Sequence, residues 1–390
     1  MPDLRTITEV AAHGDHDAGC CCQPPALDAA RATGTPLLPS NATKRQHLVR
    51  VSVVVPTCGR PQLLQRCLTS LMVQQFNPHH VEIIVVDDAV QSTLSSVTRA
   101  LVVECAVSTV AHGLEIRYLP PLGPTAPHGP AAARNRGWRS ARGAIVAFTD
   151  DDTQARADWL ACGMDGFSQL SMSGLTGSAT PQVDAVWGRI TMPLHGPASD
   201  YELDAKGLER AEFVTANCFC RRSVLERIDG FDERFRMAWR EDADLYFRLL
   251  DAGVRVLHVP SAVVVRPIRP AGWGVSLQQQ RKILFDALLF KKHPIRYREK
   301  IRARPRWDYY VIVAALVGAA AASFNDQPPL AATLAAIWLV LTMSFCLRRL
   351  RPAIKTPSHI LEMIVTSALI PPVAVFWRLV GALRFKVGFL

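Results

Sequence analysis

Residues 51–88 read VSVVVPTCGRPQLLQRCLTSLMVQQFNPHHVEIIVVDD, and this stretch predicts the fold class of the chain. Residues 51–57 and 81–88 are continuous apolar runs, which are typical of strands buried on both faces of a parallel sheet. Residues 61–75 between them carry apolar side chains at helical spacing. Strand, helix and strand in this order predict an α/β domain whose sheet is mostly parallel and covered on both faces.

Carboxylates follow the next predicted strand. The apolar run 144–148 is continued by Thr149 and then by Asp150, Asp151 and Asp152. Ligands in open α/β sheets bind at the carboxyl ends of the strands, so we expect these acids on the same rim as the ends of the first two strands. Clustered carboxylates offer hard oxygen ligands to Mg²⁺ or Mn²⁺, which can then be held against a diphosphate. The alternative is a polar turn that caps the following helix.

The pattern of strands and helices continues over residues 155–270. Residues 185–192 and 254–260 resemble strands, and residues 240–253 form a helical pattern that starts with acids. Neither GxGxxG after the first strand nor GxxxxGK[ST] occurs. A Rossmann dinucleotide site and a P-loop therefore have no support in the sequence.

The positive charge of the chain is concentrated before its apolar C-terminal part. The formal net charge is +10, and residues 291–306 carry eight Lys or Arg against the single acid Glu299. A basic cluster next to an apolar segment favours anionic lipid headgroups as partners, and no nucleic acid is predicted. We expect residues 271–306 to form a basic amphipathic segment at the membrane interface.

The N-terminal part of the chain has the composition of a leader. Residues 1–48 are rich in Ala and Pro and lack the continuous apolar stretch of a signal peptide, so we expect them to be disordered. Cys20, Cys21 and Cys22 are adjacent and lack the CxxC spacing of closed zinc sites. The other cysteines are scattered, which fits reduced thiols in a cytosolic compartment.

Two apolar segments, residues 307–324 and 330–347, are separated by NDQPP. Each is close to the length that spans a bilayer, so we predict a transmembrane hairpin over residues 307–347, with a buried helical pair as the alternative. Basic flanks on both outer ends place them in the cytoplasm, together with the α/β domain, at a plasma or inner membrane. For residues 348–390 we predict re-entrant or interfacial helices, because Pro371-Pro372 should interrupt a straight helix.

Seven motifs occur in order along the first 270 residues: VVVPTCGRP, IIVVDDAV, GPAAARNRG, VAFTDDD, NCFCRR, GFDERF and WREDADLYFRL. Together they resemble the family 2 glycosyltransferases, whose fold is the nucleotide-sugar-binding GT-A type. The resemblance covers roughly residues 50–270 and implies a GT-A domain over residues 49–270.

The resemblance implies donor contacts along the rim. It sets Pro56, Thr57 and Arg60 against the nucleotide and Asp88 at its base or ribose. Thr57 can hydrogen-bond a uracil edge, and a carboxylate suits a base N–H or a ribose hydroxyl. The alternative for each residue taken alone is a structural role. Thr57 would then cap a helix, Arg60 would lie in solvent, and Asp88 would end a strand. This chain has DDAV, beginning at Asp87, where many relatives have DDGS.

The resemblance to the family also implies residues that contact the phosphates and the metal. It favours Arg134 and Asn135 as residues that face the substrate, near the N-terminal amides of their helix. Asp150 and Asp152 align with the acids of the DXD-type motif, which holds a divalent metal against the diphosphate. Asp151 shares the donor site, because the trio is continuous. The alternative for the arginines is a solvated helix face.

The second pair of acids, Glu241 and Asp242, resembles the ED motif of the family. In that motif the Asp is the general base that takes the proton of the acceptor hydroxyl, and a single displacement inverts the anomeric carbon. The alternative is a helix start whose acids complement the dipole. The stretch beginning at Gln278 is similar to the QxxRW signature of processive synthases, but Lys282 stands at the Trp position, which argues against processive synthesis.

The resemblance thus implies a metal-dependent inverting glycosyltransferase. Its partners are a nucleotide-sugar donor, a lipid-linked or envelope-glycan acceptor, and membrane lipids. One alternative is a nucleotidyl or phosphosugar transferase, which needs no second acid pair. The other is a non-catalytic membrane scaffold that retains a sugar-nucleotide fold.

Overall fold

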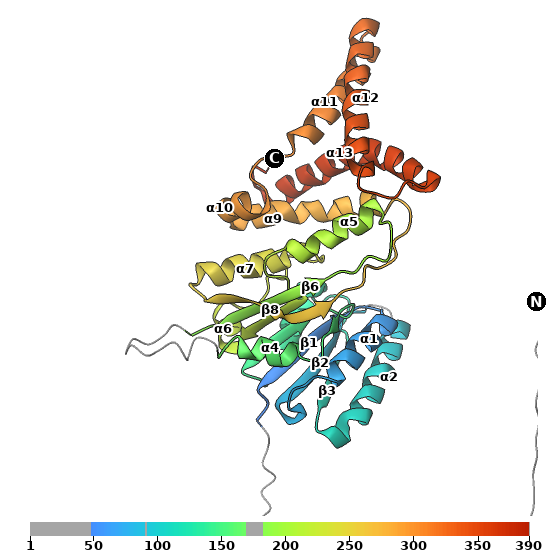
Figure 1. The fold of residues 1–390 in the computed structure, drawn as a ribbon. Helices are drawn as coiled ribbons and strands as arrows, with labels where there is room; N and C mark the ends of the chain where they lie inside the picture. Colours follow the sequence, from blue (N-terminus) through green and yellow to red (C-terminus); the bar gives the residue numbers. More distant parts are fainter. Residues whose placement is uncertain (1–47, 90–91, 169–181, 390) are drawn as a thin grey trace, which may run out of the picture. The chain divides into compact units, whose positions relative to one another are not determined.

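The computed structural model describes residues 48–89, 92–168 and 182–389. The predicted leader, residues 1–48, lies outside the described residues except for Leu48. The described chain forms an α/β sheet domain followed by C-terminal helices (Figure 1). The strands are β1 Val51–Thr57, β2 Val81–Asp87, β3 Glu115–Leu119, β4 Ile145–Thr149, β5 Gln154–Ala155, β6 Ala185–Thr191, β7 Asn217–Arg221 and β8 Val256–Val265.

All eight strands belong to one mixed sheet, in the order β3-β2-β1-β4-β7-β6-β8-β5. Its first half is parallel as predicted, because β1 pairs in parallel with both β2 and β4, and β2 with β3. In its second half β7 runs antiparallel to β4 and β6, β5 is antiparallel to β8, and only β6 and β8 pair in parallel. Four of the seven strand pairs are thus parallel, and the antiparallel pairs make the sheet mixed. An apolar run marks a buried strand, but it does not reveal the direction of that strand.

Both faces of the sheet are buried, which explains the continuous apolar runs. Val53 and Val55 of β1 belong to the core cluster with Leu68 and its neighbours, whereas Val54 belongs to the cluster with Trp138. Successive side chains of a strand point to opposite faces, so each face receives its own helices. The helices of this domain are α1 Pro61–Met72, α2 Ser92–Thr109, α3 Pro130–Arg139, α4 Trp159–Asp165, α5 Asp200–Lys206, α6 Arg222–Arg227 and α7 Glu241–Asp251, with 3₁₀ turns η1 Pro78–His80, η2 Val110–His112 and η3 Gly207–Arg210.

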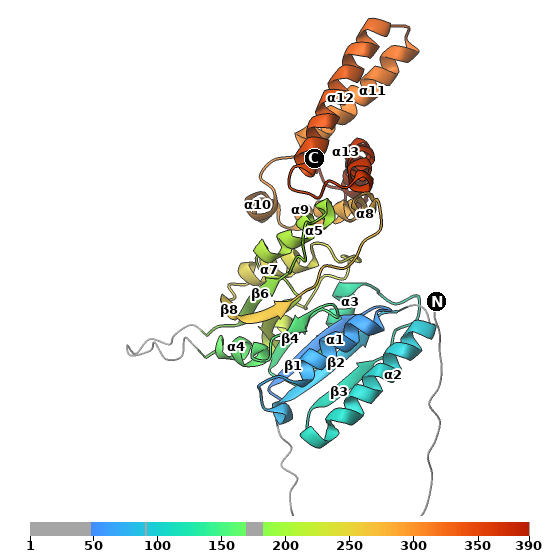
Figure 2. The same cartoon turned by 45° about the vertical axis from the view of Figure 1, so that its right-hand side comes forward.

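Helix α13 joins the hairpin helices to the segment α8 to α9. This helix contacts α8, η4 and α9 on one side and also both helices of the hairpin, α11 and α12, which lie side by side in Figures 1 and 2. The elements are α8 Val275–Gln279, η4 Gln280–Ile283, α9 Leu284–Lys292, α10 Pro294–Arg296, the π-helical turn η5 Tyr297–Ile301, α11 Trp307–Phe324, α12 Pro328–Leu350 and α13 Pro357–Phe385.

The expected interruption at Pro371-Pro372 is wrong, because α13 runs through both prolines. Pro371 is buried in the contact of this helix with its neighbours, so tertiary packing stabilises a segment whose local sequence disfavours a helix. Among the described residues, four helices are long and apolar enough to cross a membrane by length and composition. One of them, Thr93–His112, covers the sheet as α2 and η2, and the others are α11, α12 and α13.

Candidate active site

Strand register brings the ends of β1 and β4 together. Val54 lies opposite Phe148 in the parallel pair, and three residues further on Thr57 and Asp151 leave the same edge of the sheet. The Thr57 hydroxyl donates to Asp151 Oδ2 at 2.8 Å, and the Arg60 guanidinium lies 2.8 Å from Asp151 Oδ1. Asp151 is fully buried, and burial raises its pKa to about 6. The structure thus brings three of the predicted donor residues together, with Asp151 as their common partner.

Arg134 joins the two groups of acids. Its guanidinium donates to Asp150 Oδ1 at 2.6 Å and to Glu241 Oε1 at 3.2 Å, and the residue is only 3% exposed. Burial opposes ionisation of Asp150, but the charges of Arg134 and Arg266 outweigh it and hold the pKa of Asp150 below its usual value. Burial, followed by the charge of Asp242, raises the pKa of Glu241 to about 7. Acids that lie 91 positions apart in the sequence therefore share one counter-ion.

Sequence reasoning missed two arginines at the acid trio. The Arg266 guanidinium lies 3.3 Å from Asp150 Oδ2 and donates to Asp152 Oδ2 at 3.0 Å, and Arg269 Nε lies 3.3 Å from the same Asp152 oxygen. The cause is the antiparallel pairing of β5 with β8, which returns the chain after β8 to the acids. The signal in the sequence is RPIRP directly after the last strand, at the rim where anionic ligands bind.

Asp150 and Asp152 have a chemistry that fits a divalent cation. Asp152 Oδ1 is buried and has no hydrogen-bond partner among the described residues, and an orphaned carboxylate oxygen suits a hard metal ion. Within the described ranges, no group of three or more His, Cys, Asp or Glu side chains is arranged to hold a metal. Two carboxylates are nevertheless sufficient for Mg²⁺ or Mn²⁺ when phosphate oxygens and water supply the other ligands.

Asp242 lies in the first turn of α7, where backbone geometry positions it. Arg240 precedes the helix with a left-handed φ of 75°, which is uncommon for a residue with a side chain. Asp286 of α9 stabilises this turn by accepting hydrogen bonds from Arg240 Nε at 2.6 Å and Trp239 Nε1 at 2.9 Å. Burial raises the pKa of the Asp242 carboxyl, which makes its carboxylate a stronger base.

Both acid groups line one cavity of about 410 Å³, and we use the name acid cavity for it. Its wall brings together α3, the end of β4, the start of α7 and the segment after β8. Lys282, at the position where QxxRW has its Trp, also lines this cavity. The cavity is further lined by Arg134, Asp150, Asp152, Tyr201, Asp204, Trp239, Glu241, Asp242, Arg266 and Arg269.

Asp88 is fixed beside the same rim. Its backbone N–H donates to the Thr57 carbonyl at 2.9 Å, and its carboxylate contacts His128 Nδ1 at 2.9 Å and accepts from the Gly129 N–H at 2.8 Å. Gly129 has a φ of 110°, and a Cβ there would lie 2.5 Å from the Arg236 carbonyl oxygen, so only glycine fits. The role of Asp88 at the base or ribose stays a prediction, as does that of Pro56 at the end of β1. His128 had no signal in the sequence.

Asn135 has a structural task. Its amide nitrogen donates to the Phe231 carbonyl and to Glu233 Oε1, and its amide oxygen accepts from Phe231 N–H and Trp138 Nε1, all at 2.8 Å. The side chain is 1% exposed. These four bonds use all the donors and acceptors of the amide, so none is left for a sugar or nucleotide. The predicted contact of Asn135 with substrate therefore receives no support from its geometry.

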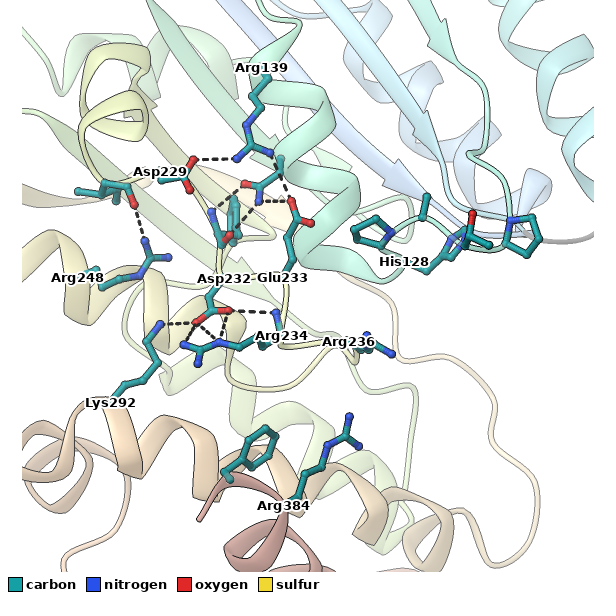
Figure 3. A pocket seen from close by; sticks show the side chains of 18 residues that line it. His128, Arg139, Asp229, Asp232, Glu233, Arg234, Arg236, Arg248, Lys292 and Arg384 are labelled. Carbon is teal, nitrogen blue, oxygen red and sulfur yellow. Dashed lines mark hydrogen bonds and ion pairs between the residues drawn. The ribbon is translucent and has the colours of Figure 1, made fainter. Parts of the chain in front are cut away.

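A larger cavity, of about 1040 Å³, is lined by His128, Asp232 and Lys292, among other residues (Figure 3). It is rich in cations, but most of them are already paired: Asp232, for example, binds both Arg234 and Lys292 at 2.6 Å. None of the acids predicted to bind the metal or act as base lines this cavity. The acid cavity, although smaller, is therefore the candidate active site.

Two models of known protein families match the chain. "Glycosyl transferase family 2" matches residues 52–229, and "Glycosyl transferase family group 2" matches residues 145–380, more than half of the chain. The chain belongs to the family 2 glycosyltransferases. This family membership and the mixed α/β sheet confirm the predictions of a glycosyltransferase and of a GT-A domain.

Similar glycosyltransferases come from archaea and bacteria. Glycosyltransferase AglE from Haloferax volcanii is 28% identical over 242 residues, which are 60% of this chain and 71% of AglE. Pre-mycofactocin glycosyltransferase from Mycobacterium tuberculosis is 29% identical over 260 residues, 62% of this chain and 47% of that protein. The chain thus spans about half the length of that relative. Mannosyltransferase PcManGT from Pyrobaculum calidifontis, solved in complex with GDP-Man and Mn²⁺, shares the fold with a TM-score of 0.51, 20% identity and coverage of 84% of this chain and 87% of PcManGT.

Proposed function

We propose that this family 2 glycosyltransferase moves a sugar, with inversion, from a nucleotide-diphosphate sugar to a lipid-linked or envelope-glycan acceptor at the cytoplasmic face of a membrane. One observation carries the proposal. The acids suited to a metal, Asp150 and Asp152, and the acids suited to a base, Glu241 and Asp242, line the same cavity and are joined by Arg134. A nucleotidyl or phosphosugar transferase needs only the first group, so the second favours glycosyl transfer.

On the donor side, three cations are positioned for the departing diphosphate. Arg134, Arg266 and Arg269 lie around the acid trio, where fixed positive charge stabilises the negative charge that develops on the leaving group. A divalent cation held by Asp150 and Asp152 would supply further stabilisation of that charge. The complex of PcManGT with GDP-Man and Mn²⁺ supports this choice of donor class and metal.

On the acceptor side, Asp242 is the proposed general base. The acceptor oxygen forms a bond to the anomeric carbon while the bond from that carbon to the diphosphate oxygen breaks, and the hydroxyl proton passes to the Asp242 carboxylate. Glu241 is held by Arg134 and has its own pKa raised to about 7 by burial and by Asp242. Asp242, which carries no arginine partner within hydrogen-bond distance among the described residues, is therefore the better placed of the two acids.

The membrane part of the proposal rests on α11, α12 and α13. We propose that α11 and α12 span the bilayer as a hairpin whose basic flanks lie in the cytoplasm. One side of α13 is buried against α9 and its neighbours, and the other exposes large apolar side chains, which suits a helix that lies in the membrane surface. These exposed side chains are Leu361, Ile364, Leu369, Phe376, Leu379 and Leu383.

A binding screen tests the proposal. The full chain in detergent is titrated with nucleotide-diphosphate sugars, with and without Mn²⁺, and at least one sugar is expected to bind in a metal-dependent way. Asp152→Ala should abolish that binding. Asp242→Asn should bind the donor within about twofold of wild type, yet lose about 10²- to 10⁴-fold in transfer. Asp229→Asn, at an exposed acid that pairs with Arg139, is the matched control and should transfer normally.

Two results would overturn the proposal. If no nucleotide sugar binds, the proposed class of donor is wrong. If Asp242→Asn transfers the sugar at the wild-type rate, Asp242 is not the general base.

A further inference from the structure

A second cavity, of about 440 Å³, adjoins the acid cavity, and we use the name outer cavity for it. Tyr201 and Arg269 line both cavities. Asp242 lines only the acid cavity, and Trp273 only the outer one. Tyr201 and Arg269 therefore form a wall that the outer cavity shares with the cavity of the proposed base.

Trp273 presents an aromatic surface to the outer cavity. The residue is 52% exposed, and its ring makes no aromatic, cation–π or hydrogen-bond contact with the part of the chain that the structure describes. Its loop is fixed all the same, because the N–H of Gly274 donates to Glu362 Oε1 of α13 at 2.7 Å. An exposed indole on a fixed loop is a preformed platform for an apolar ring face.

The two residues between the cavities keep free hydrogen-bonding capacity. The Tyr201 hydroxyl has no hydrogen-bond partner within residues 48–89, 92–168 and 182–389, and Arg269 uses only Nε for its contact with Asp152. Two nitrogens of Arg269 and the Tyr201 hydroxyl, at the shared wall, thus have no protein partner among the described residues. Groups of this kind match the hydroxyls of a sugar.

The far wall of the outer cavity belongs to the membrane-associated region. It includes Ile354, Thr356 and Met363, from the connection between α12 and α13 and from α13 itself. His359 in the same wall is buried, and its ring nitrogens contact the Asp200 N–H at 3.3 Å and Glu362 Oε2 at 3.3 Å. The His359 contact with the Asp200 N–H therefore links this wall to the start of α5.

We infer that the outer cavity is a subsite for a sugar residue of the acceptor, in which the sugar ring stacks on Trp273 while Tyr201 and Arg269 direct its hydroxyl toward Asp242. The inference rests on the proposed function, since it specifies where the acceptor of that reaction binds. It also assigns Trp273 the stacking task that Lys282 cannot perform at the QxxRW-like position.

The test compares two reactions of the full chain. Transfer is measured from the donor found in the binding screen to the acceptors in native membrane vesicles, and hydrolysis of the same donor is measured without vesicles. Trp273→Ala should raise the KM for vesicle-borne acceptor about tenfold and leave donor hydrolysis within about twofold. Trp273→Phe, which keeps a ring, should restore most of the acceptor KM. Tyr201→Phe should lower kcat/KM for the acceptor severalfold.

Trp307→Ala is the matched control, because Trp307 is 55% exposed and lines neither cavity. It should leave the acceptor KM unchanged. An equal loss in both Trp variants would overturn the inference, because it would indicate altered seating in the membrane. A wild-type acceptor KM for Trp273→Ala would also overturn it, while leaving the proposed function intact as long as Asp152→Ala abolishes donor hydrolysis.

Competitors distinguish a sugar from a phosphate in the outer cavity. The octyl glycosides of glucose, galactose and mannose, and octyl phosphate, are added below their micellar concentrations. Competition by at least one glycoside, weakened in Trp273→Ala, supports the inference. Competition by octyl phosphate alone, weakened in the same variant, would overturn it.

Discussion

Replacement of Asn135 by leucine distinguishes a structural role of this residue from a role in binding the donor. The side chain of leucine has nearly the same volume as that of asparagine but has no hydrogen-bonding group. It would leave the Phe231 N–H, the Phe231 carbonyl and Trp138 Nε1 without partners. Phe231 and Trp138 are buried, so water cannot replace the lost bonds.

The expected loss in the free energy of unfolding follows from these three polar groups. Each buried polar group that loses its partner costs about 1–3 kcal/mol, and with partial relaxation we expect a loss of about 3 kcal/mol in the free energy of unfolding. For a domain of this size that corresponds to a decrease in Tm of roughly 6–12 °C. The affinity for the donor, measured well below Tm, should change by less than about threefold, because no atom of Asn135 is free for a ligand.

The assay is thermal unfolding of the full chain in detergent, followed by tryptophan fluorescence, together with donor binding. Asn77→Ala is the control: it removes one capping bond, from the His79 N–H at 3.1 Å, and should cost only about 1 kcal/mol. If Asn135→Leu does not fold, Asn135→Asp, which keeps the two acceptor contacts, takes its place. A large loss of donor affinity at an unchanged Tm would refute the structural role and restore the prediction that Asn135 binds substrate.

Three further predictions concern the acids and the hairpin. Asp152→Asn should lower donor turnover about 100-fold or more in a nucleotide-release assay, and normal turnover would contradict its role in holding metal. Because the pKa of Glu241 is raised from 4.5 to about 7, the folded chain binds a proton in that window that the unfolded chain releases, so stability falls as pH rises. Glu241→Gln should flatten the fall in Tm between about pH 5 and pH 8, and unchanged pH profiles would show that Glu241 is not responsible. A reporter inserted after Asn325 should lie on the side of the membrane opposite the sheet domain, and equal protease protection of both would exclude the hairpin.

The sequence predicted those parts of the fold that one segment determines alone. Residues 51–57 and 81–88 became β1 and β2 because a run of apolar residues with β-branched side chains has few other solutions than a buried strand. The order of the strands and the directions of those in the second half of the sheet were not predictable, since they depend on which segments meet. The antiparallel β7 and the short β5 illustrate this limit.

The candidate site, like the fold, has features that one segment determines and features that depend on distant segments. The acids were predictable because each group directly follows a strand or begins a helix, but their partners were not. Arg266 reaches Asp150 and Asp152 only because β5 pairs with β8, and Asn135 is occupied by a loop about 96 positions away in the sequence. A motif indicates which residue types are present, whereas the pairing of distant segments decides what each side chain contacts.

The shared contact of Arg134 makes the donor and acceptor acids interdependent. The charge of Asp150 raises the pKa of Glu241, while the guanidinium of Arg134, which lies between them, lowers it. Asp150→Asn removes the negative charge and leaves Arg134 free to pair with Glu241 alone, so the pKa of Glu241 should fall. The pH range over which stability declines should then shift downward, and adding Glu241→Gln to Asp150→Asn should remove that shift. If Asp150→Asn does not move the pH profile, the two groups of acids are electrostatically independent, and Arg134 only holds them in place.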